Sequence, residues 1–543
     1  MANFYPRAGQ KIAPRRSVAL FALLAITMVV VSYLVIVLLA IACVYLPYLA
    51  FTSAEHPPAQ LGLLVLGGII VGATILWSLV PRREKFEVPG LLLEASAHPR
   101  LFAELQAIAA ALNEPLPREV YLVGQVNAFV ADRGGIMGFG SRRVMGIGLP
   151  LLSILTVSEM RAVLAHEFAH YYSGDTRMGP WVYKTQSAMI RAFRNIGSLG
   201  ELGRIAALQF MNLVATFILK WYFIFFLRVI NFVSRRKEYR ADELACLVAG
   251  AEPLVEGLRK IHGASMAWGP YWNSEVVPVL NQGCKPAIAD GFSRFLAAPQ
   301  IEVQVAKGIE KEIAEGKTEP YDTHPPLRDR IAAIEKLKAE PGEKDKEMAV
   351  SLLDEPESTE LQFLELVNPN LAKNSLRQVG WDEIGRTLTI PSWKAAVGEY
   401  APMMEGITAG ALPEVVKRLP QMGSKIRDPR GMLLTPQQRT QRAGQLLGMA
   451  LGLALLEKGW ELEAQPGSFF LGKGADRINT FAFMDEMIEG KISAEGWVEI
   501  CKEFGIAESE LIFVAGSTTG AGANAQEDSN SRRGLLAEDH TDS

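Results

Sequence analysis

The longest apolar segments lie near the start of the chain. Residues 18–52 contain no charged side chain, and a second apolar run, residues 61–80, follows after a short loop. A helix of about 20 apolar residues is long enough to cross a lipid bilayer. The apolar core of a signal peptide has only about 7–15 residues, so the first run is too long for that alternative. The pattern predicts a transmembrane hairpin of two helices over residues 17–81.

Basic side chains flank both ends of the predicted hairpin and are absent from the loop that connects its helices. They are Arg7, Lys11, Arg15 and Arg16 before the hairpin and Arg82, Arg83 and Lys85 after it. Because lysine and arginine stay on the cytoplasmic side of a membrane, we expect residues 1–16 to form a cytoplasmic basic tail. The same rule predicts that the chain after the hairpin faces the cytoplasm. The protein would then lie in the cell (cytoplasmic) membrane.

A third apolar stretch covers residues 205–233, but it contains Lys220 and Arg228. A charged residue at the centre of a bilayer costs about 3 kcal/mol on insertion scales. The preceding segment, residues 177–204, carries several basic residues and is a poor membrane span. We therefore favour a pair of amphipathic helices that lies in the membrane interface or packs beside the hairpin. A further span over residues 205–233 is the alternative.

The pattern after the hairpin predicts an α+β fold that is mostly helical. Residues 86–115 follow the period of an amphipathic helix, and short strands are expected at residues 118–124, 127–131 and 143–148. Together with later helices they form a predicted domain over residues 86–340, which contains one small β-sheet.

The last third of the chain has a different character. Residues 341–360 are rich in charged residues and proline, which predicts a linker. Residues 361–515 show a mixed pattern of helix and short strand, and we expect a separate C-terminal domain of unknown role. Its apolar run at residues 444–458 is too short to cross a membrane and is expected to be a buried helix. Residues 516–543 are rich in small and polar residues and predict a disordered tail.

Composition narrows the classes of function. The chain has 543 residues, enough for two or three domains, and a formal net charge of -4. Because the chain has no overall positive charge, nucleic acid is not expected as a partner. The four cysteines are scattered and form no CxxC pair: Cys43, Cys246, Cys284 and Cys501. This distribution suits a reducing compartment and argues against cysteine ligands for a metal.

A predicted helix that starts at Thr156 carries the clearest chemical signal. Thr156 and Glu159 have the spacing of a capping box, which satisfies amide groups at a helix start. His166 and His170 are four residues apart, so both imidazoles leave one face of the helix and can reach one metal ion. Glu167 stands beside them, where its carboxylate can reach a water molecule on that metal. This is the HExxH pattern of zinc hydrolases.

A catalytic zinc site of this kind needs a third protein ligand and leaves one position for water. The metzincin pattern would place a histidine at position 176, but the chain has Thr176 there. The alternative is a glutamate from a later helix, and Glu238 and Asp242 lie on one face of such a helix. Glu238 can bind the metal, while Asp242 can accept a hydrogen bond from a ligand histidine. The small side chains of Ala241 and Ala245 would let the two helices pack closely.

Three motifs carry a resemblance to a known family: Leu164–His170 (LAHEFAH), Ser234–Asp242 (SRRKEYRAD) and Asp322–Ile331 (DTHPPLRDRI). Their order, behind an N-terminal membrane anchor, makes residues 15–335 resemble the membrane zinc metallopeptidases of the HtpX and CAAX-prenyl-endopeptidase type. These enzymes are gluzincins, with an HExxH and an ExxxD motif. The resemblance implies a zinc metalloendopeptidase that holds one Zn²⁺ per chain with His166, His170 and Glu238.

Further residues are expected to take part in catalysis or substrate binding. Glu167 would act as the general base. By the resemblance, His324 lies near the scissile bond, where it would stabilise the oxyanion or position the peptide. Asn127 matches a family segment near the edge of the sheet, to which an extended peptide can add as a strand. Asn231, one or two helix turns before Glu238, is the other polar group expected near the oxyanion.

The resemblance also implies partners, which are polypeptide substrates and the lipid bilayer. An HtpX-like enzyme would remove misfolded or damaged membrane and cytoplasmic proteins. One alternative is cleavage near a prenylated C-terminus, although a two-helix anchor lacks the many helices with which such enzymes form a chamber. Another alternative is a catalytically silent membrane scaffold that binds partners through its C-terminal region, although no catalytic residue of the motifs is missing.

Overall fold

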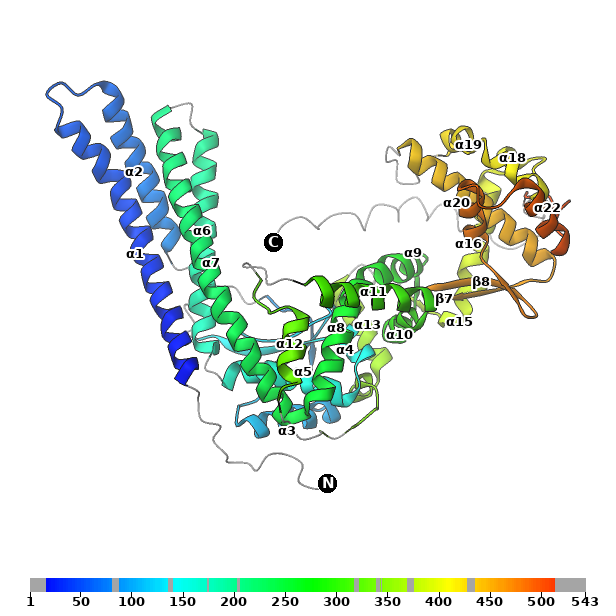
Figure 1. Cartoon of the computed structure of the whole chain (residues 1–543), viewed down its shortest axis with the longest axis horizontal. Helices are drawn as coiled ribbons and strands as arrows, with labels where there is room; N and C mark the ends of the chain where they lie inside the picture. The colour runs from blue at the N-terminus through cyan, green and yellow to red at the C-terminus, as the bar shows by residue number, and fades with distance from the viewer. Residues whose placement is uncertain are drawn as a thin grey trace. The chain divides into compact units, whose positions relative to one another are not determined.

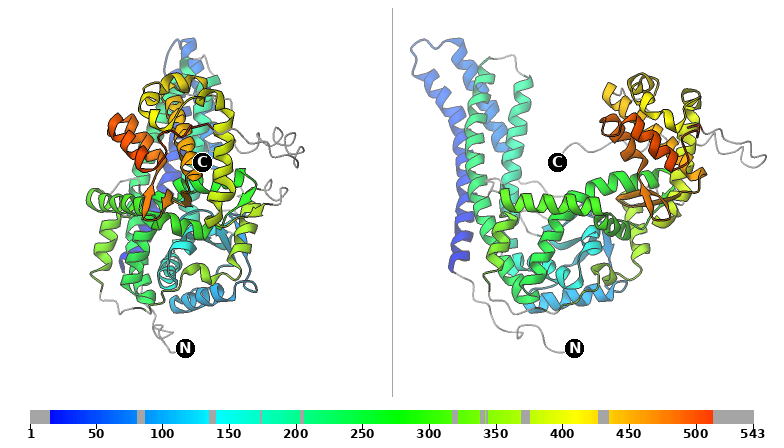
Figure 2. Two further views of the ribbon diagram at one scale, coloured as in Figure 1. Left: turned by 90° about the vertical axis from the view of Figure 1, so that its right-hand side faces the viewer. Right: turned by 45° about the vertical axis from the view of Figure 1, so that its right-hand side comes forward.

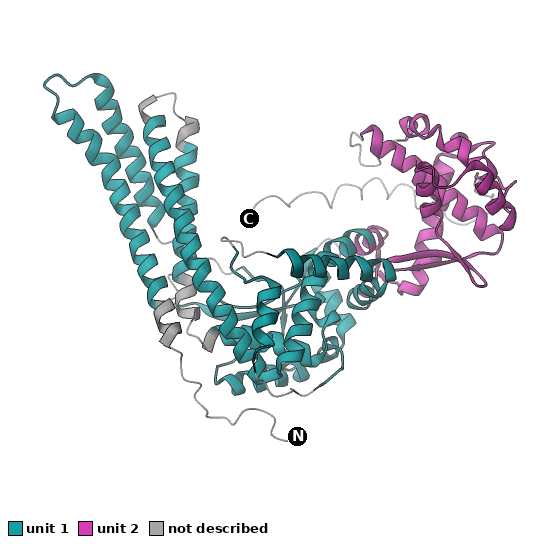
Figure 3. Cartoon of the chain, in the orientation of Figure 1, with its two compact units in different colours: residues 1–274, 288–376 teal, residues 275–287, 377–543 magenta. Residues whose placement is uncertain are grey.

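The computed structural model describes the chain in ten segments. They are residues 16–80, 87–134, 140–172, 175–202, 206–316, 322–337, 342, 344–368, 376–426 and 435–512. Residues 1–15 of the predicted basic tail (residues 1–16) and the predicted disordered tail at residues 516–543 lie outside the described residues. The chain divides into two compact units, which Figure 3 shows in different colours. Unit 1 comprises residues 1–274 and 288–376, and unit 2 comprises residues 275–287 and 377–543.

Four long helices of unit 1 lie side by side in Figure 1 and in both views of Figure 2. They are α1 (Arg16–Thr52), α2 (Ala59–Leu79), α6 (Asp175–Leu202) and α7 (Ala206–Ala249). Glycines let α1 and α2 approach closely. A Cβ atom on Gly68 would collide with the carbonyl oxygen of Cys43, and one on Gly72 would lie 2.8 Å from that of Ala40. Small residues at such positions let two membrane helices pack closely.

Three segments of this bundle are long and apolar enough to cross a membrane: Leu23–Thr52, Ala59–Leu79 and Gln209–Ala249. On α7, Leu213, Phe217 and Trp221 are more than half exposed. An exposed apolar face of this length on a helix is typical of contact with lipid.

The polar side chains of α6 are used in its packing against α2. Arg191 donates a hydrogen bond from Nη2 to the carbonyl oxygen of Ser78 at 3.0 Å, and Asn195 donates from Nδ2 to Ser78 Oγ at 2.9 Å. The pair of α6 and α7 therefore packs beside the hairpin through polar contacts as well as apolar ones.

The sheet of unit 1 has the strand order β1-β2-β4-β3. Its strands are β1 (Leu91–Leu93), β2 (Glu119–Val123), β3 (Ala128–Arg133) and β4 (Arg142–Gly148). β2 and β4 are parallel, whereas β1 and β3 pair with their neighbours in antiparallel orientation. The prediction of one helix over residues 86–115 is wrong in its first part. The backbone of β1 pairs with β2, and helix α3 (Pro99–Leu112) begins at Pro99, whose missing amide hydrogen suits the first helical turn.

Helix α5 (Val157–Tyr172) lies among the other elements of this region. It packs against α3, α7 and α8 (Ala251–Tyr271), and its Leu164 and Phe168 are fully buried. The remaining helices here are α4 (Leu149–Ile154), α10 (Ile288–Ala297), α11 (Pro299–Glu315) and α12 (Leu327–Ile334). Helices α3, α7 and α8 fix α5 on several sides, so the side chains on its remaining face have a rigid support.

Part of the segment predicted as a linker packs on the start of α5. The amide of Val157 donates to the carbonyl oxygen of Glu347 at 2.8 Å, and the amide of Ala349 donates to that of Leu155 at 2.8 Å. The 3₁₀-helix η2 (Ala349–Leu352) and helix α13 (Pro356–Val367) follow. Glu360 of α13 is buried and accepts hydrogen bonds from the first two amides of α10, at 2.8 and 3.0 Å. This segment therefore ties together helices of unit 1.

Unit 2 consists of short helices and two small sheets around one long helix, α20 (Pro436–Glu457). The π-helix η1 (Trp272–Val276) leads into it from α8. Its other helical elements are α9 (Val277–Asn281), α15 (Trp381–Ile384), η3 (Gly385–Thr389), α16 (Ile390–Glu399), α17 (Ala401–Met404), η4 (Ala409–Ala411), α18 (Leu412–Val416), α19 (Leu419–Lys425), α21 (Thr480–Ile488) and α22 (Ala494–Glu503). Its strands are β5 (Cys284–Lys285), β6 (Arg377–Gln378), β7 (Glu461–Gln465), β8 (Ser468–Lys473) and β9 (Asp476–Ile478).

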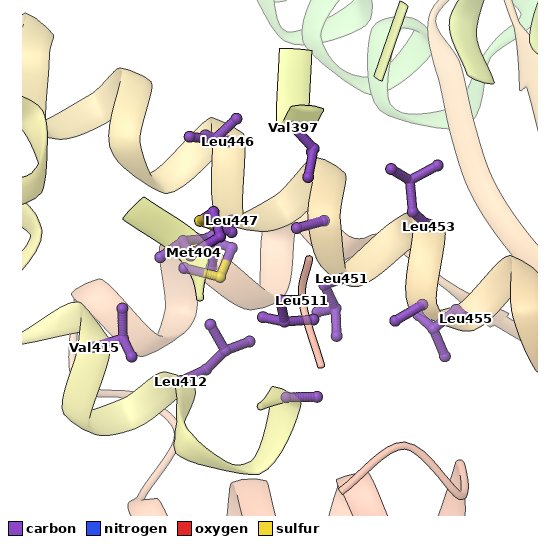
Figure 4. Close-up of a cluster of buried hydrophobic side chains, with 14 of the residues drawn as sticks. Val397, Met404, Leu412, Val415, Leu446, Leu447, Leu451, Leu453, Leu455 and Leu511 are labelled. Atoms are coloured by element: carbon purple, nitrogen blue, oxygen red, sulfur yellow. The ribbon is translucent and has the colours of Figure 1, made fainter. Parts of the chain in front are cut away.

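The core of unit 2 is apolar, as Figure 4 shows. Leu447, Leu451 and Leu455 of α20 are fully buried, and Met404 and Leu412 belong to the same cluster. The apolar run at residues 444–458 is thus a buried helix, as its length predicts. The bounds of unit 2 differ from the predicted 361–515, because α13 belongs to unit 1 and residues 275–287 belong to unit 2.

Candidate active site

The first turn of α5 is fixed by the predicted capping box. The amide of Thr156 donates to Glu159 Oε2 at 2.8 Å, and the amide of Glu159 donates to Thr156 Oγ1 at 3.3 Å. Lys260 of α8 adds an ion pair to the same carboxylate, with Nζ 2.8 Å from Oε2. These contacts satisfy amide groups at the helix start and hold α5 in register with α8.

His166, Glu167 and His170 form a cluster on one face of α5. One ligand atom from each residue lies within 4.8 Å of the others, as a shared metal ion requires. The two imidazole rings stand at 90° to each other, with centroids 4.9 Å apart. Burial lowers the pKa of His170 to about 4, so its ring is neutral at pH 7 and can offer a lone pair.

Glu238 of α7 faces both histidines. Its Oε2 lies 3.4 Å from His166 Nε2, and its Oε1 lies 3.5 Å from His170 Nε2. The close approach of the helices depends on small side chains, since Ala241 and Ala245 are buried between α7 and its neighbours. The structure thus brings together the three metal ligands predicted from the sequence.

The residues present fit a zinc ion. Glu238 is buried, and nitrogens of three histidines lie within 3.5 Å of its carboxylate oxygens: His166, His170 and His324. A buried carboxylate is costly unless a cation or hydrogen-bond donors satisfy it. Two imidazole nitrogens and one carboxylate are also a common donor set of catalytic zinc, which keeps its fourth position for water. His166, His170 and Glu238 would hold the ion.

Asp242 and Arg330 lie behind His166. Asp242 Oδ1 is 3.0 Å from His166 Nδ1, which leaves Nε2 free to face the metal position. Arg330 donates to both oxygens of Asp242, from Nε at 3.0 Å and from Nη2 at 2.6 Å. Burial disfavours the charged ring of His166, but hydrogen bonds with Asp242 and Glu238 outweigh burial and raise its pKa to about 9. A metal ion at Nε2 would compete with the proton that the raised pKa favours on this ring.

Arg330 is a site residue that sequence reasoning missed. It is only 7% exposed and belongs to α12, six residues after His324 in the third motif. One signal was available: Arg330 falls on the buried face of α12, together with Leu327, Ile331 and Ile334. An arginine on the buried face of a helix needs an acidic partner, and here that partner is Asp242.

Burial also affects the predicted general base. It raises the pKa of Glu167 to about 7, and the neighbouring His166 partly offsets this rise. A carboxylate with a pKa near the working pH can accept a proton and later release it. Glu167 therefore has the electrostatic environment of an acid–base group.

His324 lies beside Glu238, with Nδ1 2.9 Å from Oε2. The hydrogen bond to Glu238 raises the pKa of His324. Its loop is held by Asp322, whose side chain accepts from the His324 amide at 3.0 Å and whose carbonyl accepts from Arg235 Nη1 at 2.7 Å. His324 is thus within reach of the metal position but stays largely exposed.

The two asparagines occupy different places. Asn231 is buried on α7 and lines a cavity of about 280 Å³ together with Ser234, Lys237 and Thr323, the residue before His324. Asn127 is exposed and directly precedes β3, and its carbonyl oxygen accepts from the amide of Gly148 at 2.9 Å. β3 is an edge strand and packs against α5. Asn231 therefore shares helix α7 with the proposed ligand Glu238, whereas Asn127 lies beside an edge strand of the sheet.

Helix α5 carries a His-Glu-His cluster that could hold a metal ion, and it is joined to a bundle with helices of membrane-spanning length. Together these two features are typical of a membrane metallopeptidase. In agreement, residues 95–338 match the model of peptidase family M48. Residues 95–338 are thus similar to this family, and the similar curated proteins support its HtpX type.

Similar curated proteins carry the same description. The chain is 25% identical over 305 residues to protease HtpX homolog 2 of Methanosarcina mazei, which covers 55% of this chain and 92% of that protein. It is 27% identical over 233 residues to protease HtpX of Pseudomonas putida, covering 41% and 68%. It is 26% identical over 314 residues to a protease HtpX homolog of Pyrobaculum aerophilum, covering 55% and 85%. No solved structure matches the chain.

Proposed function

We propose that the chain is a zinc-dependent endopeptidase anchored in the cytoplasmic membrane, with its active site on the cytoplasmic side. The observation that carries this proposal is the approach of Glu238 to both His166 and His170, which cluster with Glu167. The family supports peptide hydrolysis, and the donor set supports zinc. The basic residues on both sides of the apolar hairpin support the orientation.

A bound zinc ion would polarise the scissile carbonyl group and lower the pKa of a water molecule. Glu167 would take the proton of that water and deliver it to the leaving amine. Asp242 would keep the proton of His166 on Nδ1, and Arg330 would neutralise Asp242, so that this buried carboxylate stays ionised.

His324 would act on the substrate side of the site. Its raised pKa favours the protonated ring, which can donate a hydrogen bond to a developing oxyanion. Asn231 is a second donor for the same purpose, from the buried side of α7. The peptide would add to the exposed edge of β3, beside Asn127, because an edge strand offers unpaired backbone groups.

The proposed substrates are misfolded or damaged membrane and cytoplasmic proteins, since the similar proteins are described as protease HtpX. CAAX-type processing is less well supported, because the described residues provide three helices of spanning length and no larger helical chamber. A silent scaffold is disfavoured because Glu167 and all three ligands are present and clustered.

The test is cleavage of casein by the purified full chain, with and without a chelator, combined with metal analysis of the same sample. We expect about one zinc per chain, loss of cleavage on chelation and recovery when zinc is restored. Full cleavage by a metal-free sample would overturn the proposal.

A further inference from the structure

The exposed face of α7 changes in character along the helix. In its first half this face is apolar apart from the exposed Lys220, and Phe217 and Phe225 are more than half exposed. Near the catalytic end it carries Phe232, which is 42% exposed, followed by Arg235 and Arg236. A change from apolar to aromatic and basic side chains is typical of the boundary between a bilayer and the cytoplasm. The same helix then continues to the metal ligand of the active site.

A groove opens between this part of α7 and α12. It has a volume of about 660 Å³ and is lined by both helices. Phe232, Ala332, Ala333 and Leu337 give it an apolar floor, while Arg236 and Lys336 are basic residues along its lining. This volume falls within the usual range for sites that bind small molecules. Since Phe232 belongs to both the groove and the exposed face of α7, the groove is continuous with the proposed lipid-facing surface.

The charges of the groove favour an anion. Its carboxylates are engaged by other residues: Asp242 by Arg330 at 2.6 Å, Glu243 by Arg240 at 2.6 Å and Asp329 by Arg328 at 3.3 Å. In contrast, the Arg236 guanidinium lies over the Phe232 ring, 5.6 Å from its centroid, and Lys336 is exposed. Within the described part of the chain, neither Arg236 nor Lys336 has an ion pair with a carboxylate. Two cationic groups are therefore available to one ligand.

We propose that this groove binds one anionic phospholipid. Its phosphate lies between Arg236 and Lys336, and its acyl chains follow the apolar face of α7 past Phe232. A lipid fits better than a soluble acidic peptide because the groove joins a charged rim to an apolar helix face of membrane-spanning length. The inference rests on the membrane anchoring in the proposed function, but not on catalysis.

The position of the groove links the lipid to the active site. Asp242 forms part of the groove lining and, on its other side, holds His166 at 3.0 Å. A lipid in the groove would exclude water from one side of the Asp242–Arg330 pair, which strengthens an ion pair. Membrane composition would thereby affect how firmly a metal ligand is positioned.

The experiment counts lipids bound to the delipidated full chain by native mass spectrometry, with phosphatidylglycerol or phosphatidylcholine added at increasing concentration. We expect one phosphatidylglycerol to bind to the wild type more tightly than phosphatidylcholine does. Each basic side chain near an anionic lipid contributes about fivefold to binding, so R236Q/K336Q should bind it about 25-fold more weakly. The matched control is K307Q/K311Q, which removes the same charge from exposed positions of α11, outside the groove.

The outcomes separate the inference from its alternatives. Equal binding of the two lipids, or unchanged binding by R236Q/K336Q, would overturn it. So would an equal loss in K307Q/K311Q, which would show only a general effect of charge. Displacement of the lipid by soluble poly-glutamate at similar concentration would assign the groove to an acidic protein segment instead. Casein cleavage by the same samples tests the proposed function separately, because selective lipid binding without cleavage would contradict catalysis and leave the lipid site intact.

Discussion

The α5–α7 contact of unit 1 and the α20 core of unit 2 are both buried, but they are built from opposite kinds of side chain. Around α20 the buried residues are apolar, such as Leu447 and Leu451. Between α5 and α7 the buried residues include His166, Glu238 and Asp242. Burial of charged groups costs free energy unless each is paired, whereas burial of leucine is favourable. The comparison teaches that stability alone accounts for the α20 core, while the charged cluster requires another reason, which we assign to metal binding and catalysis.

The largest expected effect concerns Glu167. In Glu167→Gln the amide fills the same space but cannot accept a proton, so casein cleavage should fall by about 10² to 10⁴. Zinc content should not change, because Glu167 is not one of the three proposed ligands. Turnover close to wild type in a zinc-loaded variant would contradict a catalytic role for the charged α5–α7 cluster. The main functional difference between this cluster and the apolar α20 core would then be lost.

A smaller effect is expected for His324. If it donates a hydrogen bond to the oxyanion, His324→Ala should lower the cleavage rate by about 10² to 10³. Zinc content and thermal stability should barely change, since the side chain is largely exposed. A purely structural role for the histidine predicts the reverse pattern, a small loss of stability with unaltered turnover per folded molecule.

A substitution of Asp242 tests whether charged residues beyond the three proposed ligands contribute to metal binding. Asp242→Ala removes the acceptor for His166 Nδ1 and should weaken zinc binding by about 10- to 100-fold. A titration with a competing chelator measures this change. Wild-type affinity would mean that the 3.0 Å contact with His166 does not support the metal site.

The smallest effect on catalysis is expected from the apolar core. Leu451→Ala should destabilise unit 2 by about 2 to 5 kcal/mol, because it removes a fully buried side chain. Thermal unfolding should show an earlier transition, while zinc content and casein cleavage at lower temperature stay as in the wild type. Loss of zinc in this variant would show that unit 2 supports the active site, contrary to the independent C-terminal domain that the sequence predicts.

Features that depend on local spacing could be predicted from the sequence. The capping box at Thr156, the two histidines on one face of α5 and the long apolar runs of α1 and α2 each follow from residues a few positions apart. Glu238 could also be found, because its motif repeats the same four-residue spacing on another helix.

Features that depend on contacts between residues far apart in the sequence could not be predicted. Strand β1 exists because Leu91–Leu93 meet β2, and the leucines themselves suit a helix equally well. Arg330 becomes a site residue only because α12 places it against Asp242, 88 positions earlier. The segment before α13 has the composition of a linker, yet its backbone bonds to the start of α5. In each case the partner lies far away in the sequence, where no local pattern indicates it.

The central claim, that His166, His170 and Glu238 hold one zinc ion, is tested most directly by metal content. Zinc per chain should be measured for the wild type and Glu238→Ala after the same mild chelation, with correct folding checked by circular dichroism. We expect about one zinc in the wild type and a sharp loss in the variant, because two histidines alone bind zinc far more weakly. Stoichiometric zinc in folded Glu238→Ala would contradict the assignment of the third ligand.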